Sequence, residues 1–188
     1  MGIARKTFCF LLAAVIVLPW NTSALARTWY VSPDGNDLND GTSWATAKSS
    51  IGAALERART GDSIWVRYGV YYERITLKDG VSLYGGFRGT ERTLAERPPF
   101  PRPSPDPYET VLDGDQGGSV VTTPSVAYHP YRLDGFPVCN GKSDYGGGFY
   151  CFGLAALRLT VANCTISGNT ANYGGGVYCG SSSPTLTS

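Results

Sequence analysis

The sequence predicts an all-β protein in which a repeated segment winds into a parallel β-helix, with one helix near the N-terminus. The segment 145–151 (YGGGFYC) recurs at 173–179 (YGGGVYC), and six of its seven positions are identical. The strand-length runs around these motifs alternate with a period of two, and Gly or Asn separates them. Self-similarity at such a spacing is typical of a stacked array, in which no single repeat buries its own apolar face.

Equivalent residues of neighbouring repeats should stack, because adjacent strands of a sheet lie about 4.8 Å apart. The stacked pairs expected from the 28-residue offset are Phe149 with Val177, Tyr150 with Tyr178 and Cys151 with Cys179. Alternation along the strand directs Phe149 and Cys151 inward and Tyr150 outward. The three glycines that precede each motif predict a tight corner, where side chains would clash.

Residues 1–26 have the three parts of a signal peptide in order. Arg5 and Lys6 form a basic start, residues 8–18 an apolar run, and residues 24–26 (ALA) a small-residue cleavage site. The apolar run is shorter than the roughly 20 residues that a helix needs to span a bilayer, so an uncleaved membrane anchor is the weaker alternative. We therefore expect a secreted or cell-surface protein that begins near Arg27 and has no transmembrane helix after cleavage.

Size and charge narrow the classes of partner. Cleavage after residue 26 leaves residues 27–188, a length that suits one domain. The mature chain keeps 14 of the 16 basic residues, which 15 acidic residues balance. Because no basic run follows the signal peptide, nucleic acid is not an expected partner.

Residues 27–62 predict a first strand at 29–31 and then the only helix of the mature chain, over Thr46–Gly61. Four apolar residues recur at the spacing of one helix face. They are Ile51, Ala54, Leu55 and Ala58. Ser49 or Ser50 can cap the start of this helix, and Gly61 can end it in the left-handed conformation.

The loop between this strand and this helix is rich in oxygen ligands. Asp34, Asp37 and Asp40 lie in it together with two asparagines, and carboxylates in such a loop are able to hold Ca²⁺. Asp and Asn are also the ordinary residues of turns, because their side chains accept hydrogen bonds from nearby backbone. Since no glutamate stands at the far position of an EF-hand loop, we favour turns over a calcium site.

Residues 63–188 supply the predicted coils of the β-helix. The strand-length runs are Ser63–Arg67, Arg74–Leu77, Val81–Tyr84, Thr110–Leu112, Ser119–Val121, Leu157–Val161 and Cys164–Ile166. The first three of them fit either hairpins or successive edges of a coil. Six prolines fall within residues 98–107 and predict an exposed, polyproline-like loop over 96–107. A PxxP ligand for another domain is the weaker interpretation of this loop.

Four cysteines remain after processing, namely Cys139, Cys151, Cys164 and Cys179. Their spacing does not match a zinc site, and the chain has only one histidine. A secreted protein permits disulfides, and four cysteines allow three pairings. We favour the alternative, in which they are small apolar residues whose thiols stack inside the fold.

Several segments resemble the N-terminal part of the pectate-lyase-like right-handed β-helix superfamily, known also as the pectin lyase fold. They are residues 29–37 (WYVSPDGND), 41–44 (GTSW), 61–66 (GDSIWV) and 69–71 (GVY). Residues 81–87 (VSLYGGF) and the two Gly-Gly-Gly-aromatic motifs look like secreted bacterial right-handed β-helix repeat proteins. Residues 168–171 (GNTA) are similar to repeats of chlamydial polymorphic outer-membrane proteins. The resemblance covers most of residues 28–95 and 133–188. It implies a right-handed β-helix whose early helix caps the open N-terminal end, and it implies little about activity.

No catalytic residue is predicted. The resemblance implies that a lyase of this fold needs a calcium cluster with a nearby base, and a glycoside hydrolase needs paired carboxylates. Residues 133–188 hold only Asp134 and Asp144 as acids, at positions that are not equivalent in the repeat. Asp113 and Asp115 form the best remaining pair, but the intervening glycine favours a turn. His129 lies beside a proline without a nucleophile motif nearby, so it is a poor candidate for a general base.

Tyrosines give the one candidate binding site. Tyr150 and Tyr178 should form an outward ladder, with Tyr145 and Tyr173 near the corner. Such rings stack on the faces of sugars, and they equally stack on one another.

The favoured function is that of a non-catalytic, adhesin-like module that binds an extracellular polysaccharide or a cell-surface partner. The alternative is an N-terminal fragment of a polysaccharide lyase or hydrolase whose catalytic coils follow Ser188, and an orphan fragment is a third possibility. The chain stops within a predicted coil, without a polar cap. We therefore expect a fold that is truncated at its C-terminal end and associates with itself through that open end.

Overall fold

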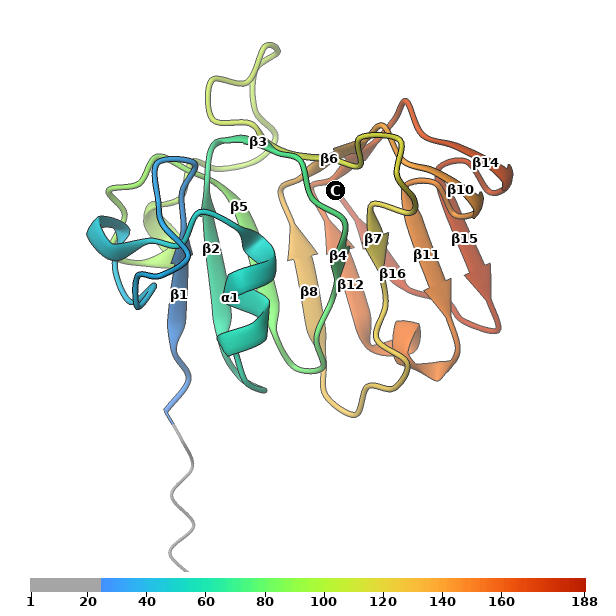
Figure 1. Cartoon of the computed structure of the whole chain (residues 1–188), viewed down its shortest axis with the longest axis horizontal. Helices are drawn as coiled ribbons and strands as arrows, with labels where there is room; N and C mark the ends of the chain where they lie inside the picture. The colour runs from blue at the N-terminus through green and yellow to red at the C-terminus, as the bar shows by residue number, and fades with distance from the viewer. Residues whose placement is uncertain (1–24) are drawn as a thin grey trace, which may run out of the picture.

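The computed structural model describes residues 25–188 (Figure 1), and the expected signal peptide lies almost entirely outside that range. The fold is β-rich, with one α-helix among the described residues. Every strand pair in the sheets is parallel. The hairpin alternative for the first strands is therefore wrong. No helix in residues 25–188 is both long and apolar enough to cross a membrane.

The strands form three larger sheets and one small one. The first sheet contains, in spatial order, β1 (Thr28–Val31), β2 (Ser63–Arg67), β5 (Ser82–Phe87), β8 (Tyr131–Asp134), β12 (Leu159–Ala162) and β16 (Thr185–Thr187). The second contains β3 (Gly69–Tyr71), β6 (Thr110–Asp113), β9 (Pro137–Cys139) and β13 (Thr165–Ile166). The third contains β4 (Ile75–Thr76), β7 (Val121–Thr122), β11 (Phe149–Phe152) and β15 (Val177–Gly180). The small sheet pairs β10 (Lys142–Tyr145) with β14 (Thr170–Tyr173).

From β2 onward the chain visits the three larger sheets in a fixed order, first, second, third and then first again. We call one such circuit a pass. In the last two complete passes, β10 and β14 lie between the strands of the second and third sheets. Because each new strand pairs in parallel beside its predecessor, residues far apart in sequence become neighbours on one surface.

The predicted repeat register is confirmed. Phe149 pairs with Val177, and Cys151 with Cys179, in the parallel pair of β11 and β15. Phe149 and Cys151 are buried, whereas Tyr150 between them is half-buried, as alternation predicts. The equivalent turn residues Asn140 and Gly168 both have a left-handed backbone, with φ of 56° and 66°. Thus the 28-residue period describes both strands and turns.

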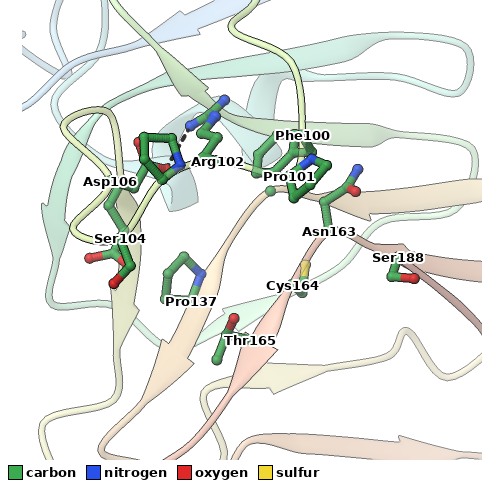
Figure 2. Close-up of a pocket in the computed structure, with 13 residues that line it drawn as sticks. Phe100, Pro101, Arg102, Ser104, Asp106, Pro137, Asn163, Cys164, Thr165 and Ser188 are labelled. Atoms are coloured by element: carbon green, nitrogen blue, oxygen red, sulfur yellow. Dashed lines mark hydrogen bonds and ion pairs between the residues drawn. The ribbon is translucent and has the colours of Figure 1, made fainter.

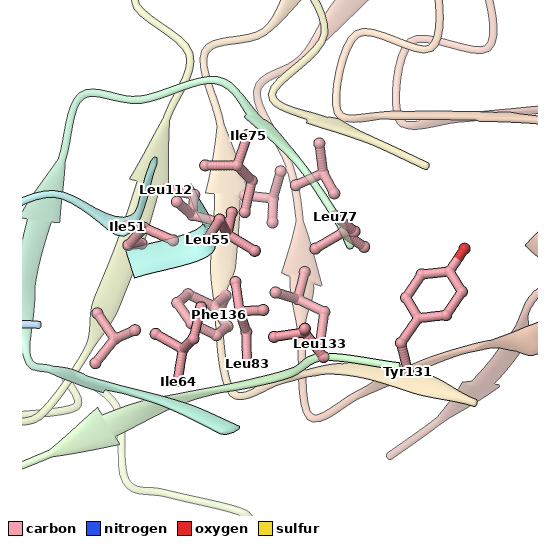
Figure 3. Close-up of a cluster of buried hydrophobic side chains, with 14 of the residues drawn as sticks. Ile51, Leu55, Ile64, Ile75, Leu77, Leu83, Leu112, Tyr131, Leu133 and Phe136 are labelled. Carbon is pink, nitrogen blue, oxygen red and sulfur yellow. The ribbon is translucent and has the colours of Figure 1, made fainter. Parts of the chain in front are cut away.

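One apolar core lies among the three larger sheets (Figure 3). In the first sheet, Ile64 pairs with Leu83, Leu83 with Leu133, and Leu133 with Val161. All four side chains are buried. Leu112 of the second sheet belongs to the same cluster, as do residues of the third sheet. Burial of such a side chain contributes about 1.5–3 kcal/mol, so these in-register columns are the main stabilising element.

The α-helix α1 (Ile51–Arg57) covers one part of this core. Ser50 caps its start, since the Ser50 side chain accepts a hydrogen bond from the N–H of Ala53. The Glu73 carboxylate accepts hydrogen bonds from the N–H groups of Ile51 and Gly52, at 2.8 and 2.9 Å. These acceptors satisfy the free N–H groups of the first turn.

The predicted helix over Thr46–Gly61 is too long at both ends. Thr46 ends a separate 3₁₀-helix (Trp44–Thr46), and Lys48 then forms a parallel bridge with Val31. Ala58 is already extended, so it is buried without belonging to the helix. Gly61 has a positive φ of 94°, but it lies in the turn before β2, where its N–H donates to the carbonyl of Gly80.

All four cysteines in the described part of the chain are free thiols, so the disulfide alternative is wrong and the stacked-thiol interpretation is confirmed for Cys151 on Cys179. Burial raises the pKa of the Cys151 thiol to about 12. Burial likewise raises the pKa of Cys164 to about 11. Both thiols are therefore protonated at neutral pH and act as small core residues.

The proline-rich loop 96–107 projects at the top of Figure 1. Most of its prolines are exposed, as predicted. Pro98 is buried, and only 5% of the Arg102 side chain is exposed. Its guanidinium donates to the carbonyls of Gly86 and Pro98, both at 3.0 Å. The loop is thus anchored to the first sheet at Gly86, and the expectation of a freely exposed loop is wrong at Pro98 and Arg102.

Candidate functional site

The four tyrosines expected to bind ligand come together on one surface, and we call them the tyrosine cluster. Its members are Tyr145, Tyr150, Tyr173 and Tyr178. Tyr145 and Tyr173 are paired residues of β10 and β14. Tyr150 and Tyr178 are paired residues of β11 and β15.

The rings of the tyrosine cluster contact one another in two directions. Tyr145 stacks on Tyr173 with centroids 5.1 Å apart, and Tyr150 stacks on Tyr178 at 5.9 Å. The edge-to-face contact of Tyr145 with Tyr178, at 5.0 Å, joins the two stacks. Each such contact contributes about 0.5–1.5 kcal/mol beyond area burial, so the rings hold one another in place.

The glycine corners bring the two stacks together. Gly146 and Gly174 follow Tyr145 and Tyr173, and both have a left-handed backbone, with φ of 60° and 65°. Gly147 lies so close to the neighbouring pass that an added Cβ would be 2.6 Å from the carbonyl oxygen of Thr170. A residue with a side chain cannot approach so closely, and therefore the glycines allow β10 to turn sharply into β11. The predicted tight corner is confirmed.

The cluster is open to solvent. The exposed fractions of Tyr145 and Tyr173 are 43% and 60%. Within residues 25–188, no protein group forms a hydrogen bond with the hydroxyl of any of these four tyrosines. The preceding residues of the same strands, Asp144 and Asn172, form a hydrogen bond of 2.9 Å in which the Asn172 side chain donates to the Asp144 carboxylate. The surface of the cluster therefore offers apolar rings and free hydroxyls within a small area.

The three candidate calcium ligands are not brought together around one point. Asp34 forms an ion pair with Arg67. Asp37 accepts hydrogen bonds from the backbone and side chain of Ser50, and Asp40 accepts one from Thr46 at 2.6 Å. The bond from Thr46 lowers the pKa of the Asp40 carboxyl below its ordinary value. No cluster of three or more metal-ligating side chains occurs in the described part of the chain.

A lysine lies in this loop at the place where a cation would bind. Lys48 is buried, and its ammonium group donates to the backbone carbonyls of Asp37 and Asn39 at 3.0 and 2.9 Å. The Lys48 ammonium group thus binds backbone carbonyl oxygens of this loop that would otherwise be available as ligands for a calcium ion. The arrangement favours ordered turns, and the calcium site stays an untested prediction.

The weak catalytic candidates have structural roles. The Asp113 carboxylate accepts hydrogen bonds from the N–H of Asp115 and from the side chain of Asn140. Asp115 has a positive φ of 45°, which confirms the turn expected for this pair. His129 pairs with Asp79 at 2.8 Å on the surface, and more than half of its side chain is exposed. Among the described residues, the His129 ring forms its one hydrogen bond with the Asp79 carboxylate.

Sequence reasoning missed a groove that the proline-rich loop forms against the second sheet (Figure 2). The groove has a volume of about 720 Å³. Phe100 and Pro101 line one side, and Pro137 and Thr165 line the other (Figure 2). The run of prolines was the available signal for a wall of this kind, but the sequence did not show which sheet it would face.

A buried ion network was also missed, and it fixes the same loop. The Asp134 carboxylate accepts hydrogen bonds from Arg97 at 2.9 Å, Arg132 at 2.7 Å and Asn163 at 2.9 Å. Burial alone would raise the pKa of Asp134, but the bonds from Asn163 and Arg132 and the charge of Arg97 outweigh it, so its pKa is lowered. Every oxygen of this carboxylate is used by the protein, and the network is therefore structural.

Comparison with known proteins adds no homologue to these observations. The chain matches no family model, and it matches neither a curated protein nor a solved structure. Because fold alone does not determine function, the tyrosine cluster is the feature from which a function is inferred.

Proposed function

We propose that this protein is a secreted or cell-surface right-handed β-helix that binds an extracellular polysaccharide through the tyrosine cluster, without catalysis. The observation that carries the proposal is the convergence of four solvent-facing tyrosine rings from four different strands. The charged and polar groups of the described residues supply no comparable site, because those considered as ligands or catalysts are engaged in turns and ion pairs.

Two features support the β-helix. The chain visits the three larger sheets in a constant order, and equivalent residues of the two repeats pair in register. A parallel strand that follows a crossover in the same sheet is right-handed in nearly all proteins, which supports the hand. The signal-peptide pattern of residues 1–26 supports secretion.

Two features support a polysaccharide as the ligand. The apolar faces and edges of tyrosine rings pack against the C–H groups of a sugar, and their hydroxyls exchange hydrogen bonds with sugar hydroxyls. The cluster also follows two successive passes, which provides an extended contact for a chain-like ligand rather than an enclosed pocket.

The test compares tyrosine variants with a matched control. Tyr145→Ala and Tyr173→Ala each remove one ring of the exposed stack. Tyr72→Ala removes a tyrosine elsewhere whose exposed fraction, 71%, is somewhat higher than theirs. Binding is measured by electrophoresis through gels that contain neutral or acidic polysaccharides, and then on a glycan array. Because each truncation removes a ring that would stack on the sugar, the cluster variants should have dissociation constants about tenfold higher, and Tyr72→Ala should bind like wild type.

Two results would contradict the proposal. One is retardation of the wild-type protein by none of the polysaccharides. The other is retardation that Tyr145→Ala, Tyr173→Ala and their double variant leave unchanged. Circular dichroism of each variant confirms that the fold persists, so that weaker binding reflects the missing rings.

A further inference from the structure

Two neighbouring loops lie at the lower edge of Figure 1, and they carry a second group of exposed apolar side chains. These loops are residues 123–130, which connect β7 with β8, and residues 153–158, which connect β11 with β12. The second loop contains a 3₁₀-helix (Leu154–Arg158), which Figure 1 shows in orange beneath β11. We call this surface the apolar rim. Its members are Val126, Tyr128, Leu154 and Leu157 in the loops, and Phe152 at the end of β11, whose ring stacks on Tyr150 with centroids 6.2 Å apart. Their exposed fractions range from 53% to 75%.

Strand pairing holds the two loops side by side. Thr122 pairs with Tyr150 where the loops begin, and Tyr131 pairs with Leu159 where they end. The Thr123 side chain accepts a hydrogen bond from the N–H of Phe152. The corresponding connections in the flanking passes, residues 77–81 and 181–184, are shorter. The two loops of the rim therefore extend beyond their neighbours.

The rim is held in a fixed shape with its large side chains directed outward. Ala155 and Ala156, between Leu154 and Leu157, are buried. The Tyr131 hydroxyl donates a hydrogen bond to the Ala155 carbonyl at 3.0 Å. The two small residues thus face the core, while Leu154 and Leu157 on either side of them face solvent. Exposed leucines in a rigid element are a feature of an interaction surface.

The charged residues at the apolar rim indicate which kinds of partner can bind there. Residues 123–130 and 152–158 contain no acidic residue, and Arg158 follows Leu157. In the described part of the chain, Arg158 forms no ion pair. The acid beside the rim is Asp79, whose carboxylate accepts hydrogen bonds from the N–H groups of Tyr128 and His129 and pairs with the His129 ring. The apolar rim thus combines apolar side chains with the unpaired charge of Arg158 and carries no unpaired carboxylate. This combination favours a partner that has both apolar and anionic groups.

We propose that the apolar rim inserts into the surface of a lipid bilayer that contains anionic headgroups. Leu154, Leu157 and Phe152 enter the boundary of the acyl chains, Tyr128 lies at the level of the headgroups, and Arg158 contacts a lipid phosphate. Apolar side chains together with a cation are the combination that binds peripheral proteins to membranes. The apolar rim projects from the protein, and a deformable lipid surface is able to accommodate it. A folded protein partner would need a concave surface of complementary shape.

The experiment measures co-sedimentation of the full chain with sucrose-loaded vesicles of phosphatidylcholine and phosphatidylglycerol. The test variant is Leu154→Ser/Leu157→Ser. The matched control is Leu38→Ser, since Leu38 is 94% exposed in a loop near the N-terminus. Because the double variant lacks two inserted leucines, its partition coefficient between vesicles and water should be at least about tenfold lower than that of wild type. The control variant should bind like wild type. Arg158→Gln should weaken binding to anionic vesicles only, and added salt should weaken wild-type binding.

A second readout tests insertion directly. A tryptophan in place of Leu157 (Leu157→Trp) should show a blue-shifted emission with vesicles and quenching by brominated acyl chains. The proposal fails if the wild-type protein stays in the supernatant with anionic vesicles, or if Leu154→Ser/Leu157→Ser binds as well as wild type. It also fails if light scattering shows an oligomer that this double variant converts to monomers, because the rim would then contact a second copy of the chain. The polysaccharide test uses other residues, so either proposal can fail without the other.

Discussion

The in-register column of the first sheet gives a quantitative test of how burial stabilises this fold. Leu133 and Leu186 flank Val161 in that column, since Val161 pairs with both of them. Leu133 is fully buried, whereas 60% of Leu186 is exposed. The two leucines have the same chemistry and the same strand position, and they differ mainly in the number of neighbours that cover them.

The expected costs of truncation differ severalfold. Leu133→Ala removes a fully buried side chain and leaves a cavity, which costs about 2.7–5 kcal/mol for buried leucines. Because 60% of Leu186 is exposed, only about four-tenths of this residue is buried, and a fully buried leucine contributes about 1.5–3 kcal/mol. Leu186→Ala should therefore cost about 1.2 kcal/mol at most. The difference between the variants should be at least about 1.5 kcal/mol.

The assay is equilibrium unfolding in urea, followed by circular dichroism and by tryptophan fluorescence. Coincident transitions from the two probes and an unchanged m value show that the free energies of unfolding are comparable. Equal costs for Leu133→Ala and Leu186→Ala would refute the reasoning, because burial in the column would then not determine stability. A cost below about 1 kcal/mol for Leu133→Ala would refute it as well.

Three further predictions concern a corner glycine, a buried acid and two thiols. An added Cβ at Gly148 would be 2.5 Å from the Gly176 carbonyl oxygen, whereas an added Cβ at the equivalent Gly176 would make only ordinary contacts. Urea unfolding should therefore show that Gly148→Ala is destabilised by about 1–3 kcal/mol and that Gly176→Ala has nearly the stability of wild type. The lowered pKa of Asp134 means that its ionised form stabilises the fold above the unfolded value of about 3.9, and that this contribution is lost as the pH falls through the folded pKa. Urea unfolding between pH 7 and pH 3 should therefore show a smaller acid-dependent loss for Asp134→Asn than for wild type, and parallel curves would contradict this assignment. Burial raises the pKa values of Cys151 and Cys164 to about 12 and 11, so iodoacetamide at pH 8 should label both slowly until urea unfolds the protein, as mass spectrometry of the peptides would show. Rapid labelling of either thiol in the folded protein would contradict its burial.

Much of the strand framework was predictable because it depends on local alternation. The runs that contain Ile64, Leu83 and Val161 place apolar residues at every second position, and those residues face the core. The length of the helix was not predictable in the same way. Ala58 continues the apolar spacing of the helix, but it is buried as an extended residue after the helix ends. Helical spacing shows that a residue is buried, and it does not show which backbone conformation buries it.

The burial of two cations was not predictable from the sequence, because most of their partners are carbonyl groups that only the fold brings together. Lys48 binds two carbonyls of the preceding loop. Arg102 forms an ion pair with Asp106, four residues away, but it also donates to the carbonyls of Gly86, Pro98 and Tyr108. Carbonyl groups occur at every residue, so the sequence carries no sign of which will converge. Composition assigns such lysines and arginines to the surface, and only backbone geometry reverses that expectation.

The two stacks of the tyrosine cluster were predictable from the sequence, but the contact between the stacks was not. The 28-residue offset alone predicts that Tyr145 stacks on Tyr173 and Tyr150 on Tyr178, but the contact that joins the stacks depends on the glycine corner. Inside the fold, the same offset places Phe149 on Val177, two side chains of different size and shape. One inward position of this strand pair therefore accepts different residues, whereas the cluster positions have tyrosine in both repeats. Burial cannot account for identity on the outer face, where Tyr173 is 60% exposed. Mutual stacking explains why the rings lie parallel, and their free hydroxyls and open edges leave a surface on which a ligand adds contacts without displacing any.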